Sequence, residues 1–340
     1  MAILVTGGLG YIGSHTVVAL LEKDEEVVIL DDLSNSSLEA LSRIKDITSV
    51  EPGFYLGSIL DRALLKKIFT EENITDVIHF AGLKSVGESV SQPLKYYEVN
   101  ITGSLCLFDE MLKAGVHNLI FSSSATVYGE PETIPLTEAC RVGGTTNPYG
   151  TSKLMVEKIL SDLSLAHPAL NITILRYFNP AGAHPSGHIG EDPNGIPNNL
   201  MPYVCQVAIG KRATLSIYGN DYPTKDGTGV RDFIHVTDLA EGHIAALNHR
   251  QHIPNLKIYN LGTGKGYSVL DIVEAFKRVT TRSVPYVFVE RRTGDIAECW
   301  SDSSKARTEL GWQATRDLDD MVRDAWNWQQ KNPDGYKNHK

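Results

Sequence analysis

The sequence predicts an α/β protein with a doubly wound parallel sheet and a smaller mixed α/β domain beside it. Short apolar runs, rich in β-branched residues and closed by Gly, Asp, Ser or Asn, indicate buried strands. They occupy residues 2–6, 26–30, 75–82, 118–124 and 171–179. Helical patterns separate them, the clearest at 12–21 and 94–114. Such strand–helix alternation is typical of a parallel sheet covered by helices on both faces.

The composition of the chain changes after Phe178. Residues 179–202 are dense in Pro, Gly and Asn and predict a long ordered loop, a kind of segment that is usually functional. Strand and helix patterns return at 232–261. With 340 residues, 42% of them hydrophobic, the chain can form one large and one smaller core. We therefore predict a first domain over 1–178, to which 232–261 returns, and a second domain over 179–231 and 262–340.

Charge and cysteine content exclude several classes of protein. The formal net charge of −9 argues against nucleic-acid binding and against an anionic membrane surface. Apolar runs fall short of the ~20 residues that span a bilayer, and a strand pattern rather than a signal peptide follows Met1. The cysteines show no paired or metal-like spacing: Cys106, Cys140, Cys205 and Cys299. We therefore expect reduced thiols in a cytoplasmic protein.

A glycine-rich turn follows the first strand pattern and opens a helix pattern. Gly7, Gly10 and Gly13 stand in "VTGGLGYIGSH", where missing side chains let backbone N–H groups and the positive helix end approach a pyrophosphate. Asp31 ends the second strand pattern, 18 residues after Gly13. A carboxylate there accepts hydrogen bonds from the ribose hydroxyls of NAD and repels the extra phosphate of NADP. The turn and the acid predict a Rossmann-type domain that binds NAD.

A tyrosine and a lysine interrupt the apolar face of the helix pattern after Pro148. One face carries, in order, Tyr149, Lys153, Val156, Leu160 and Leu163. The lower residues suit a core, whereas a phenol and an ammonium at the ligand edge of the sheet break the pattern, and such breaks tend to mark function. The strand at 118–124 delivers Ser122, Ser123 and Ser124 to the same edge.

The chemistry of alcohol oxidation gives this pair a role. Oxidising an alcohol with NAD requires a base, and free tyrosine, with a pKa of ~10, is too protonated at neutral pH. Lowering that pKa by ~2–3 units requires roughly 3–4 kcal/mol of preference for phenolate. A lysine ammonium and a positive nicotinamide ring can supply it in a partly desolvated site. We therefore predict that Tyr149 is the base.

Two other patterns are interpreted as incidental. The Tyr-x-x-x-Lys spacing recurs at Tyr336 and Lys340, but in a polar tail that adjoins no predicted strand end. His184 and His188 lie in a Pro- and Gly-rich segment without an evident Cys or acidic ligand nearby, so no metal site is predicted.

The whole chain resembles the extended short-chain dehydrogenase/reductases that act on nucleotide sugars, and within them most closely the UDP-glucose 4-epimerase family. The motifs that carry the resemblance are "GGLGYIGSH", "HFAGLKSVGES", "FSSSATVYG", "LRYFNPAGAHPSG", "GIPNNLMP", "YGNDYPTKDGTGVRDFIHV", "YNLGTGKG" and "RRTGD". The resemblance implies NAD-dependent interconversion of UDP-galactose and UDP-glucose, by reversible oxidation at sugar carbon 4 through a 4-keto intermediate. It also implies that the first domain binds NAD and the second the nucleotide sugar.

The resemblance also assigns site residues by position. The catalytic ones would be Tyr149, Lys153 and Ser124. The cofactor contacts would be Gly7, Gly10, Tyr11, Ile12, Gly13, Asp31, Asn35, Ser58, Ile59, Phe80, Ala81, Gly82, Lys84, Asn100, Ser122, Tyr149, Lys153 and Phe178. The contacts to a UDP-hexose would be Lys84, Ser124, Tyr149, Asn179, Asn199, Leu200, Ser216, Ile217, Tyr218, Arg231, Arg292, Asp295 and Cys299. Arginine is the residue type expected to clamp a pyrophosphate, which fits Arg231 and Arg292.

Two positions depart from the family pattern. Ser58 stands where Asp is common, and a serine still accepts one hydrogen bond, so we expect weaker NAD retention without loss of function. Cys299 stands where some bacterial members that prefer plain UDP-hexoses carry tyrosine. The smaller side chain leaves room beside sugar carbon 2, so the hypothesis is that UDP-GlcNAc and UDP-GalNAc are also interconverted, the alternative being a neutral change in the pocket lining.

Two alternative functions stay open on the same fold. A nucleotide-sugar 4,6-dehydratase would carry an acidic pair after the strand-end serine, where this chain has Ala125 and Thr126. A non-catalytic NAD-sensing regulator typically lacks the tyrosine–lysine pair, which this chain retains. The resemblance further implies a homodimer formed through the helices around 93–114 and 149–166.

Overall fold

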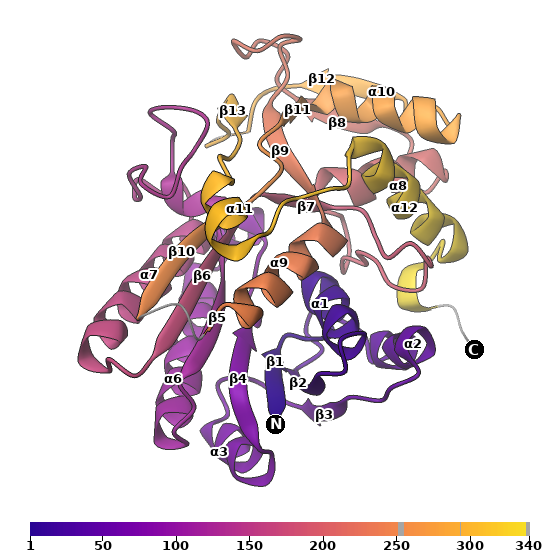
Figure 1. The fold of residues 1–340 in the computed structure, drawn as a ribbon. Helices are drawn as coiled ribbons and strands as arrows, with labels where there is room; N and C mark the ends of the chain where they lie inside the picture. Colours follow the sequence, from indigo (N-terminus) through magenta and orange to yellow (C-terminus); the bar gives the residue numbers. More distant parts are fainter. Residues whose placement is uncertain (251–254, 293, 338–340) are drawn as a thin grey trace.

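The computed structural model describes residues 1–250, 255–292 and 294–337, and a sheet of seven parallel strands lies at its centre (Figure 1). The strand order is β10-β6-β5-β4-β1-β2-β3. These strands are β1 (Ala2–Thr6), β2 (Glu26–Asp31), β3 (Gly53–Leu56), β4 (Ile74–His79), β5 (Asn118–Ser124), β6 (Asn171–Tyr177) and β10 (Leu256–Leu261). The predicted doubly wound fold is confirmed. Strand β3 was not predicted, because none of its four residues is fully buried and its sequence lacks a clear apolar run.

Helices cover both faces of this sheet because alternate strand residues point to opposite sides. Ile3 and Val5 of β1 enter one core, and Leu4 enters the other. The first face packs under α1 (Tyr11–Leu21), α2 (Glu39–Thr48) and α9 (Val236–Asn248), and the second under α3 (Arg62–Glu71), α6 (Gly103–Lys113) and α7 (Pro148–Ala166), as Figure 1 shows.

The predicted helix at 94–114 is helical throughout, but it is not one regular α-helix. It comprises α5 (Pro93–Tyr97), a π-helical segment η1 (Glu98–Thr102) and α6, and it follows the short α4 (Val86–Ser91). The wider π turn carries Asn100, whose side chain is 3% exposed. Such turns occur frequently at functional sites, and a 3.6-residue pattern gives no signal for them.

Most of the remaining elements form a smaller region beyond the carboxyl ends of the central strands (Figure 1). Its strands and helices are β7 (Asn179–Ala181), β8 (Leu215–Tyr218), β9 (Val230–His235), β11 (Gly266–Ser268), β12 (Tyr286–Val289), β13 (Glu298–Cys299), α8 (Leu200–Ala208), α10 (Val269–Thr280) and α12 (Leu318–Lys331). Helix α11 (Ser304–Leu310) packs instead on β10 at the edge of the central sheet. The short η2 (Ala125–Tyr128) follows β5, and η4 (Gly335–Lys337) follows α12. The helices α8, α10 and α12 share a separate apolar core with β8.

The segment 232–261 divides between the two sheets. Strand β9 pairs with β7, β11 and β13 in the smaller region, whereas β10 pairs with β6 at the edge of the central sheet. Helix α9, which joins them, contributes to the core against α1. The boundaries of the two functional domains stay a prediction.

The long loop after β7 is held by contacts from both regions. Arg43 of α2 donates a hydrogen bond of 2.9 Å to the carbonyl oxygen of His188. Trp328 of α12 donates one of 3.3 Å to the carbonyl oxygen of Glu191. The loop therefore lies between the central sheet's helices and the smaller region's last helix.

The expectation of a polar tail at the C-terminus is wrong for Tyr336. This side chain is 8% exposed, and its ring lies 4.9 Å from that of Trp328 and 5.0 Å from the Arg43 guanidinium. Its partner in the second Tyr-x-x-x-Lys spacing, Lys340, lies outside the described residues. None of the described helices is both long enough and apolar enough to cross a membrane.

Candidate active site

The glycine turn between β1 and α1 has no room for side chains. A Cβ atom on Gly7, whose φ is +71°, would lie 2.8 Å from the amide nitrogen of Ala81, and one on Gly13 would lie 2.2 Å from the carbonyl oxygen of Gly7. Gly10 precedes α1 without a side-chain cap, so the first-turn amides of α1 are available to an anion. This cradle fits a pyrophosphate.

Asp31 lies beside that turn at the carboxyl end of β2. Its carboxylate, 6% exposed, accepts hydrogen bonds from the amides of Leu9 at 2.9 Å and Leu33 at 3.0 Å and from the hydroxyl of Ser36 at 2.6 Å. These bonds fix the carboxylate next to the glycine turn. A ribose held by a carboxylate at this place is typical of NAD sites, so the residues present fit that cofactor.

The loop after β4 is joined to α7 by Asn100. The Asn100 side chain accepts a hydrogen bond of 2.7 Å from the amide of Leu83 and donates bonds of 3.0 Å to the Leu83 carbonyl and 2.9 Å to the Ser152 hydroxyl. A Cβ atom on Gly82 would lie 3.8 Å from Nζ of Lys153. The predicted residues Gly82, Asn100 and Lys153 therefore meet in one place.

Lys153 is buried in the second turn of α7, which begins at a helix cap: Asn147 accepts a hydrogen bond from the amide of Gly150. The Lys153 ammonium donates a hydrogen bond of 2.8 Å to the carbonyl oxygen of Ser122 and lies 5.0 Å from the centre of the Phe121 ring. Burial lowers the pKa of Lys153 to about 8, against the opposing effect of Glu157. The lysine is therefore held at the end of β5, where Glu157 offsets only part of the effect of burial on its pKa.

Tyr149 and Ser124 complete this cluster. Burial raises the pKa of the Tyr149 phenol, and the neighbouring Ser124 side chain opposes that rise. The Ser124 hydroxyl also accepts bonds from the amide of Thr126 at 3.2 Å and from its hydroxyl at 3.0 Å. In the protein alone the phenol is protonated at neutral pH, so any lowering of its pKa requires charge brought by ligands.

The predicted sugar-side residues Asn179, Arg231 and Cys299 lie on adjoining strands of the small sheet. Asn179 is opposite Phe233 in the β7–β9 pairing, and Arg231 is opposite Cys299 in the β9–β13 pairing. Cys299 is 8% exposed, and it packs in one cluster with four buried side chains: Val127, Tyr128, Leu136 and Phe178. Position 299 therefore lies against the segment that follows Ser124.

Strand β8 and the segment after β12 carry the residues predicted to hold the nucleotide. The Arg292 guanidinium lies 4.7 Å from the centre of the Tyr218 ring, and its Nε donates a hydrogen bond of 2.8 Å to the Asp295 carboxylate. Arg231 donates one of 2.9 Å to the carbonyl oxygen of Val230. Ser216 and Ile217 lie on β8 beside Tyr218.

A glutamate that the sequence did not signal joins residues from both predicted sets. The Glu191 carboxylate, 8% exposed, accepts hydrogen bonds from Nζ of Lys84 at 3.1 Å and from the Asn199 amide at 2.6 Å. The same ammonium lies 5.7 Å from the centre of the Tyr11 ring. Glu191 belongs to the long loop, whose composition predicts order but no particular contact.

The other predicted residues occupy varied positions. Ile59 and Phe178 are buried, Asn35 is exposed, Phe80 lies 4.8 Å from the His243 ring, and Leu200 begins α8. The Ser58 hydroxyl accepts a hydrogen bond of 3.2 Å from the amide of Leu60, so it is engaged in its own turn. His184 contacts the Ser186 hydroxyl at 2.8 Å.

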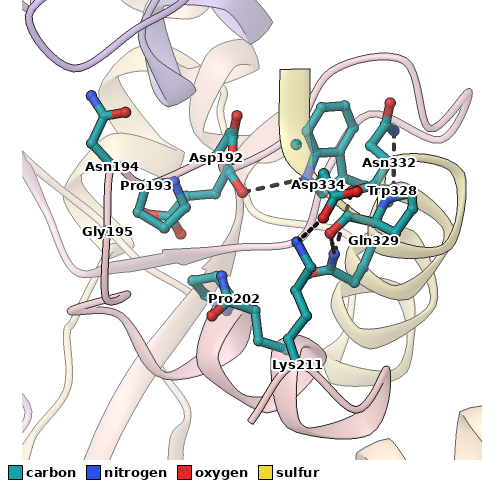
Figure 2. A pocket seen from close by; sticks show the side chains of 14 residues that line it. Asp192, Pro193, Asn194, Gly195, Pro202, Lys211, Trp328, Gln329, Asn332 and Asp334 are labelled. Atoms are coloured by element: carbon teal, nitrogen blue, oxygen red, sulfur yellow. Dashed lines mark hydrogen bonds and ion pairs between the residues drawn. The ribbon is translucent and has the colours of Figure 1, made fainter. Parts of the chain in front are cut away.

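A polar pocket of about 170 Å³ lies between the long loop, α8 and the C-terminal part of the chain (Figure 2). Lys211 and Asp334 form an ion pair of 2.7 Å at this pocket. Its lining is Glu191, Asp192, Pro193, Asn194, Gly195, Pro202, Gln206, Lys211, Trp328, Gln329, Asn332, Pro333, Asp334 and Gly335. Glu191 of this lining contacts Lys84 and Asn199 of the predicted site. The lining contains none of Tyr149, Lys153 and Ser124, so the pocket is not the candidate active site.

The fold and these contacts define a class of protein: a nucleotide-cofactor-dependent enzyme of the dehydrogenase/reductase type. The glycine cradle and Asp31 provide the cofactor half of such a site. The cluster of Tyr149, Lys153 and Ser124 at the end of β5 provides groups able to move a proton at an alcohol.

Comparisons with known proteins identify the family within this class. The model of the NAD dependent epimerase/dehydratase family matches residues 3–262. The UDP-glucose 4-epimerase of Pasteurella multocida (strain Pm70) is 64% identical over 337 residues, 99% of this chain and 100% of that protein. The crystal structure of UDP-glucose 4-epimerase from Bifidobacterium longum, in complex with NAD+ and UDP, has a TM-score of 0.96 and 52% identity, over 98% of this chain and 100% of that one. The chain belongs to the NAD dependent epimerase/dehydratase family, in which it groups with the UDP-glucose 4-epimerases.

Proposed function

We propose that this protein interconverts UDP-galactose and UDP-glucose by reversible oxidation at sugar carbon 4. The observation that carries the proposal is the cluster at the end of β5, where the Lys153 ammonium is 2.8 Å from the Ser122 carbonyl and the Ser124 side chain lies beside the Tyr149 phenol. Identity of 64% to a UDP-glucose 4-epimerase over nearly the whole chain supports it further.

Cofactor binding is proposed for the glycine turn, Asp31, and the loop after β4. The first-turn amides of α1 would receive the pyrophosphate, and the Asp31 carboxylate would accept hydrogen bonds from the ribose. NAD, when bound, would supply the acceptor for the hydride that leaves carbon 4, and a positively charged ring near the phenol. Lys153 is proposed to bind the nicotinamide ribose with the same ammonium that holds the Ser122 carbonyl.

Tyr149 is proposed to act as the base. It would take the proton from the 4′-hydroxyl of the sugar, and the Ser124 hydroxyl, which lies beside the phenol, would bond to the same oxygen. The Lys153 ammonium would stabilise the phenolate, since a positive charge in a desolvated site lowers the pKa of a nearby phenol. When the 4-keto sugar is reduced on its opposite face, Tyr149 would return the proton.

Firm binding of the diphosphate and looser binding of the hexose fit this cycle. Arg231 and Arg292 are proposed to anchor the phosphates by charge-assisted hydrogen bonds, and Ser216 to Tyr218 to contact the nucleotide. Asn179, Asn199 and Lys84 would contact the sugar. Epimerisation requires the sugar to present either face to the same hydride carrier, so its contacts must be exchangeable while the diphosphate stays fixed.

The test is proton NMR of UDP-galactose incubated with the purified protein, first without added NAD. Growth of the anomeric signal of UDP-glucose supports the proposal and shows that cofactor accompanies the protein. A 4-keto-6-deoxy product would indicate a 4,6-dehydratase instead, and no reaction even with added NAD would favour a regulator. The dehydratase is disfavoured because Ala125 and Thr126, rather than an acidic pair, follow Ser124 in η2.

A second substrate pair is proposed on the basis of Cys299. This side chain packs with Phe178, which precedes Asn179, and with residues that follow Ser124. Because Cys299 is small, it leaves space next to the hexose, between the proposed sugar contacts Asn179 and Ser124. We propose that an N-acetyl group on carbon 2 fits there, so that UDP-GalNAc and UDP-GlcNAc are interconverted as well.

A homodimer is proposed through the second face of the central sheet. Large apolar side chains on α4, α5, α6 and α7 are exposed there: Val90 (63%), Leu94 (81%), Leu105 (41%) and Met155 (43%). Apolar side chains concentrated on neighbouring helices suit an interface between copies. A cytoplasmic location is also proposed, because the four cysteines are free thiols, as in a reducing compartment.

A further inference from the structure

The face of α7 that carries Tyr149 and Lys153 carries a further buried residue, Glu157, one turn along the helix. Tyr149, Lys153 and Glu157 are spaced by four residues, so they lie on one stripe of the helix. The three consecutive residues at the end of β5 meet this stripe. Ser124 lies beside the Tyr149 phenol, the Ser122 carbonyl accepts a hydrogen bond from Lys153, and the Ser123 hydroxyl donates one of 2.5 Å to the Glu157 carboxylate.

The Glu157 carboxylate is buried and forms an ion pair with Arg176. Its side chain is 6% exposed, and Arg176 of β6, 3% exposed, binds it with two hydrogen bonds of 3.0 and 2.6 Å. Replacing a buried ion pair by apolar residues is often neutral or stabilising, so stability alone does not explain a charge here. The position of the pair, directly behind the proposed catalytic residues, suggests a different role.

Arg176 extends this contact across the sheet. It is opposite Ser123 in the β5–β6 pairing and opposite Asn260 in the β6–β10 pairing. It also donates a hydrogen bond of 3.0 Å to the hydroxyl of Tyr128, which in turn donates one of 2.7 Å to the Asn260 side chain. Tyr128 ends η2, the turn that begins directly after Ser124. The network therefore holds the segments on both sides of Ser124.

We propose that Glu157 is a positioning residue for the reaction: its carboxylate holds the three serines at the end of β5 in register with Tyr149 and Lys153. The inference rests on the proposed epimerase activity and assigns a role to a residue that does not touch substrate or cofactor. Glu157 acts through its neighbours, by placing Ser124 and by adding a negative charge one turn below the Lys153 ammonium.

The negative charge of Glu157 affects the pKa of Lys153. Burial lowers the pKa of Lys153, and Glu157 raises it. The other groups near the lysine do not supply that compensation: Tyr149 is a protonated phenol, and His79 of β4 is neutral because burial lowers its pKa to about 3. Without the carboxylate the ammonium should lose its proton at lower pH.

The test compares Glu157→Gln, the double variant Glu157→Gln/Arg176→Met, and a matched control, Asp238→Asn. Glu157→Gln alone leaves Arg176 buried without a charge partner, and the double variant removes that defect. Asp238 is a fully buried carboxylate paired with Arg316 at 2.5 Å in another part of the molecule. Arg316 keeps a second partner, Glu241, at 3.0 Å. The control therefore reports what neutralising a buried, arginine-paired carboxylate does by itself.

For both Glu157 variants we expect kcat with UDP-galactose to fall by about 10- to 100-fold, the size of effect that small misplacements produce. KM and bound NAD should stay near the wild-type values. The falling limb of the kcat–pH profile at high pH should move to lower pH. Asp238→Asn should lower the melting temperature without moving that limb.

A wild-type kcat and pH profile in the double variant would overturn the proposal, because Glu157 would then serve only to neutralise Arg176. If Glu157→Gln does not fold, the double variant decides alone. Failure of the epimerase proposal is distinguishable, since the wild-type protein would then be inactive with UDP-galactose. An active wild type with variants like it contradicts only the role of Glu157.

Discussion

The Nζ atom of Lys153 donates a 2.8 Å hydrogen bond to the carbonyl oxygen of Ser122. This bond joins the second turn of α7 to the end of β5, so the proposed base and the charge that assists it are fixed to the central sheet. Because the ammonium is buried there, its pKa is lowered to about 8. The Lys153 ammonium is thus needed for the proposed chemistry, but its burial lowers the stability of the folded protein.

Removal of the phenol hydroxyl tests the proposed base. Tyr149→Phe keeps the ring and its packing, so NAD content and melting temperature should stay near wild type. The kcat with UDP-galactose should fall by about 10²- to 10⁴-fold, the usual contribution of general acid–base catalysis. Near-normal turnover in the variant would contradict the assignment of Tyr149 as the base.

The buried lysine should carry a stability penalty that depends on pH. Its pKa is lowered from 10.5 to about 8, so the unfolded chain binds more protons than the folded one between these values and stability rises with pH there. Lys153→Met removes a penalty of about 3 kcal/mol at pH 7, less the lost hydrogen bond of about 1 kcal/mol.

Urea unfolding at pH 7 and near pH 10 measures this effect. Lys153→Met should be inactive yet more stable than the wild type at pH 7, and the difference should shrink at the higher pH. A variant less stable than the wild type at pH 7, with no change of the difference with pH, would contradict the assigned cost.

The third glycine of the turn should tolerate no side chain. In Gly13→Ala, the new Cβ would lie 2.2 Å from the Gly7 carbonyl oxygen. Overpacking of this kind typically costs 1–3 kcal/mol, and here it distorts the proposed pyrophosphate cradle. We expect loss of NAD from the purified protein, measured by release and chromatography. Gly87→Ala is the matched control, since nothing lies within 4 Å of its Cβ, and it should retain NAD.

Position 299 should control the size of the sugar. Cys299→Tyr fills the space next to Val127 and Phe178, so turnover of UDP-GalNAc should be abolished while that of UDP-galactose is spared. Parallel NMR assays of both substrates measure the ratio, with Cys299→Ser as a control that preserves volume. Equal loss of both activities in the tyrosine variant would contradict a selective role.

The sequence predicts those parts of the molecule that depend on local patterns. Gly7, Gly10 and Gly13 follow a strand and open a helix, a turn whose geometry is set within a dozen residues. The stripe of Tyr149 and Lys153 is visible because its polar residues interrupt an apolar face. Their meeting with Ser124 is predictable because parallel strands end at the same edge of a sheet.

Features that depend on distant partners are not predictable in the same way. Glu157 follows Val156 and resembles an ordinary polar position, and its burial depends on Arg176, which lies on another strand. The charged Arg176 within an apolar strand pattern is the one sequence signal of that pair. Glu191 gives no such signal, because its contacts with Lys84 and Asn199 arise from the path of a long loop.

Retention of a label on carbon 4 tests the central claim most directly. UDP-galactose carrying deuterium at carbon 4 is converted by the wild-type protein, and the UDP-glucose formed is examined by proton NMR. If hydride leaves carbon 4 and returns to the same carbon within the site, the product keeps its deuterium and its carbon-4 proton signal is absent. UDP-glucose with a proton from solvent at carbon 4 would contradict the mechanism.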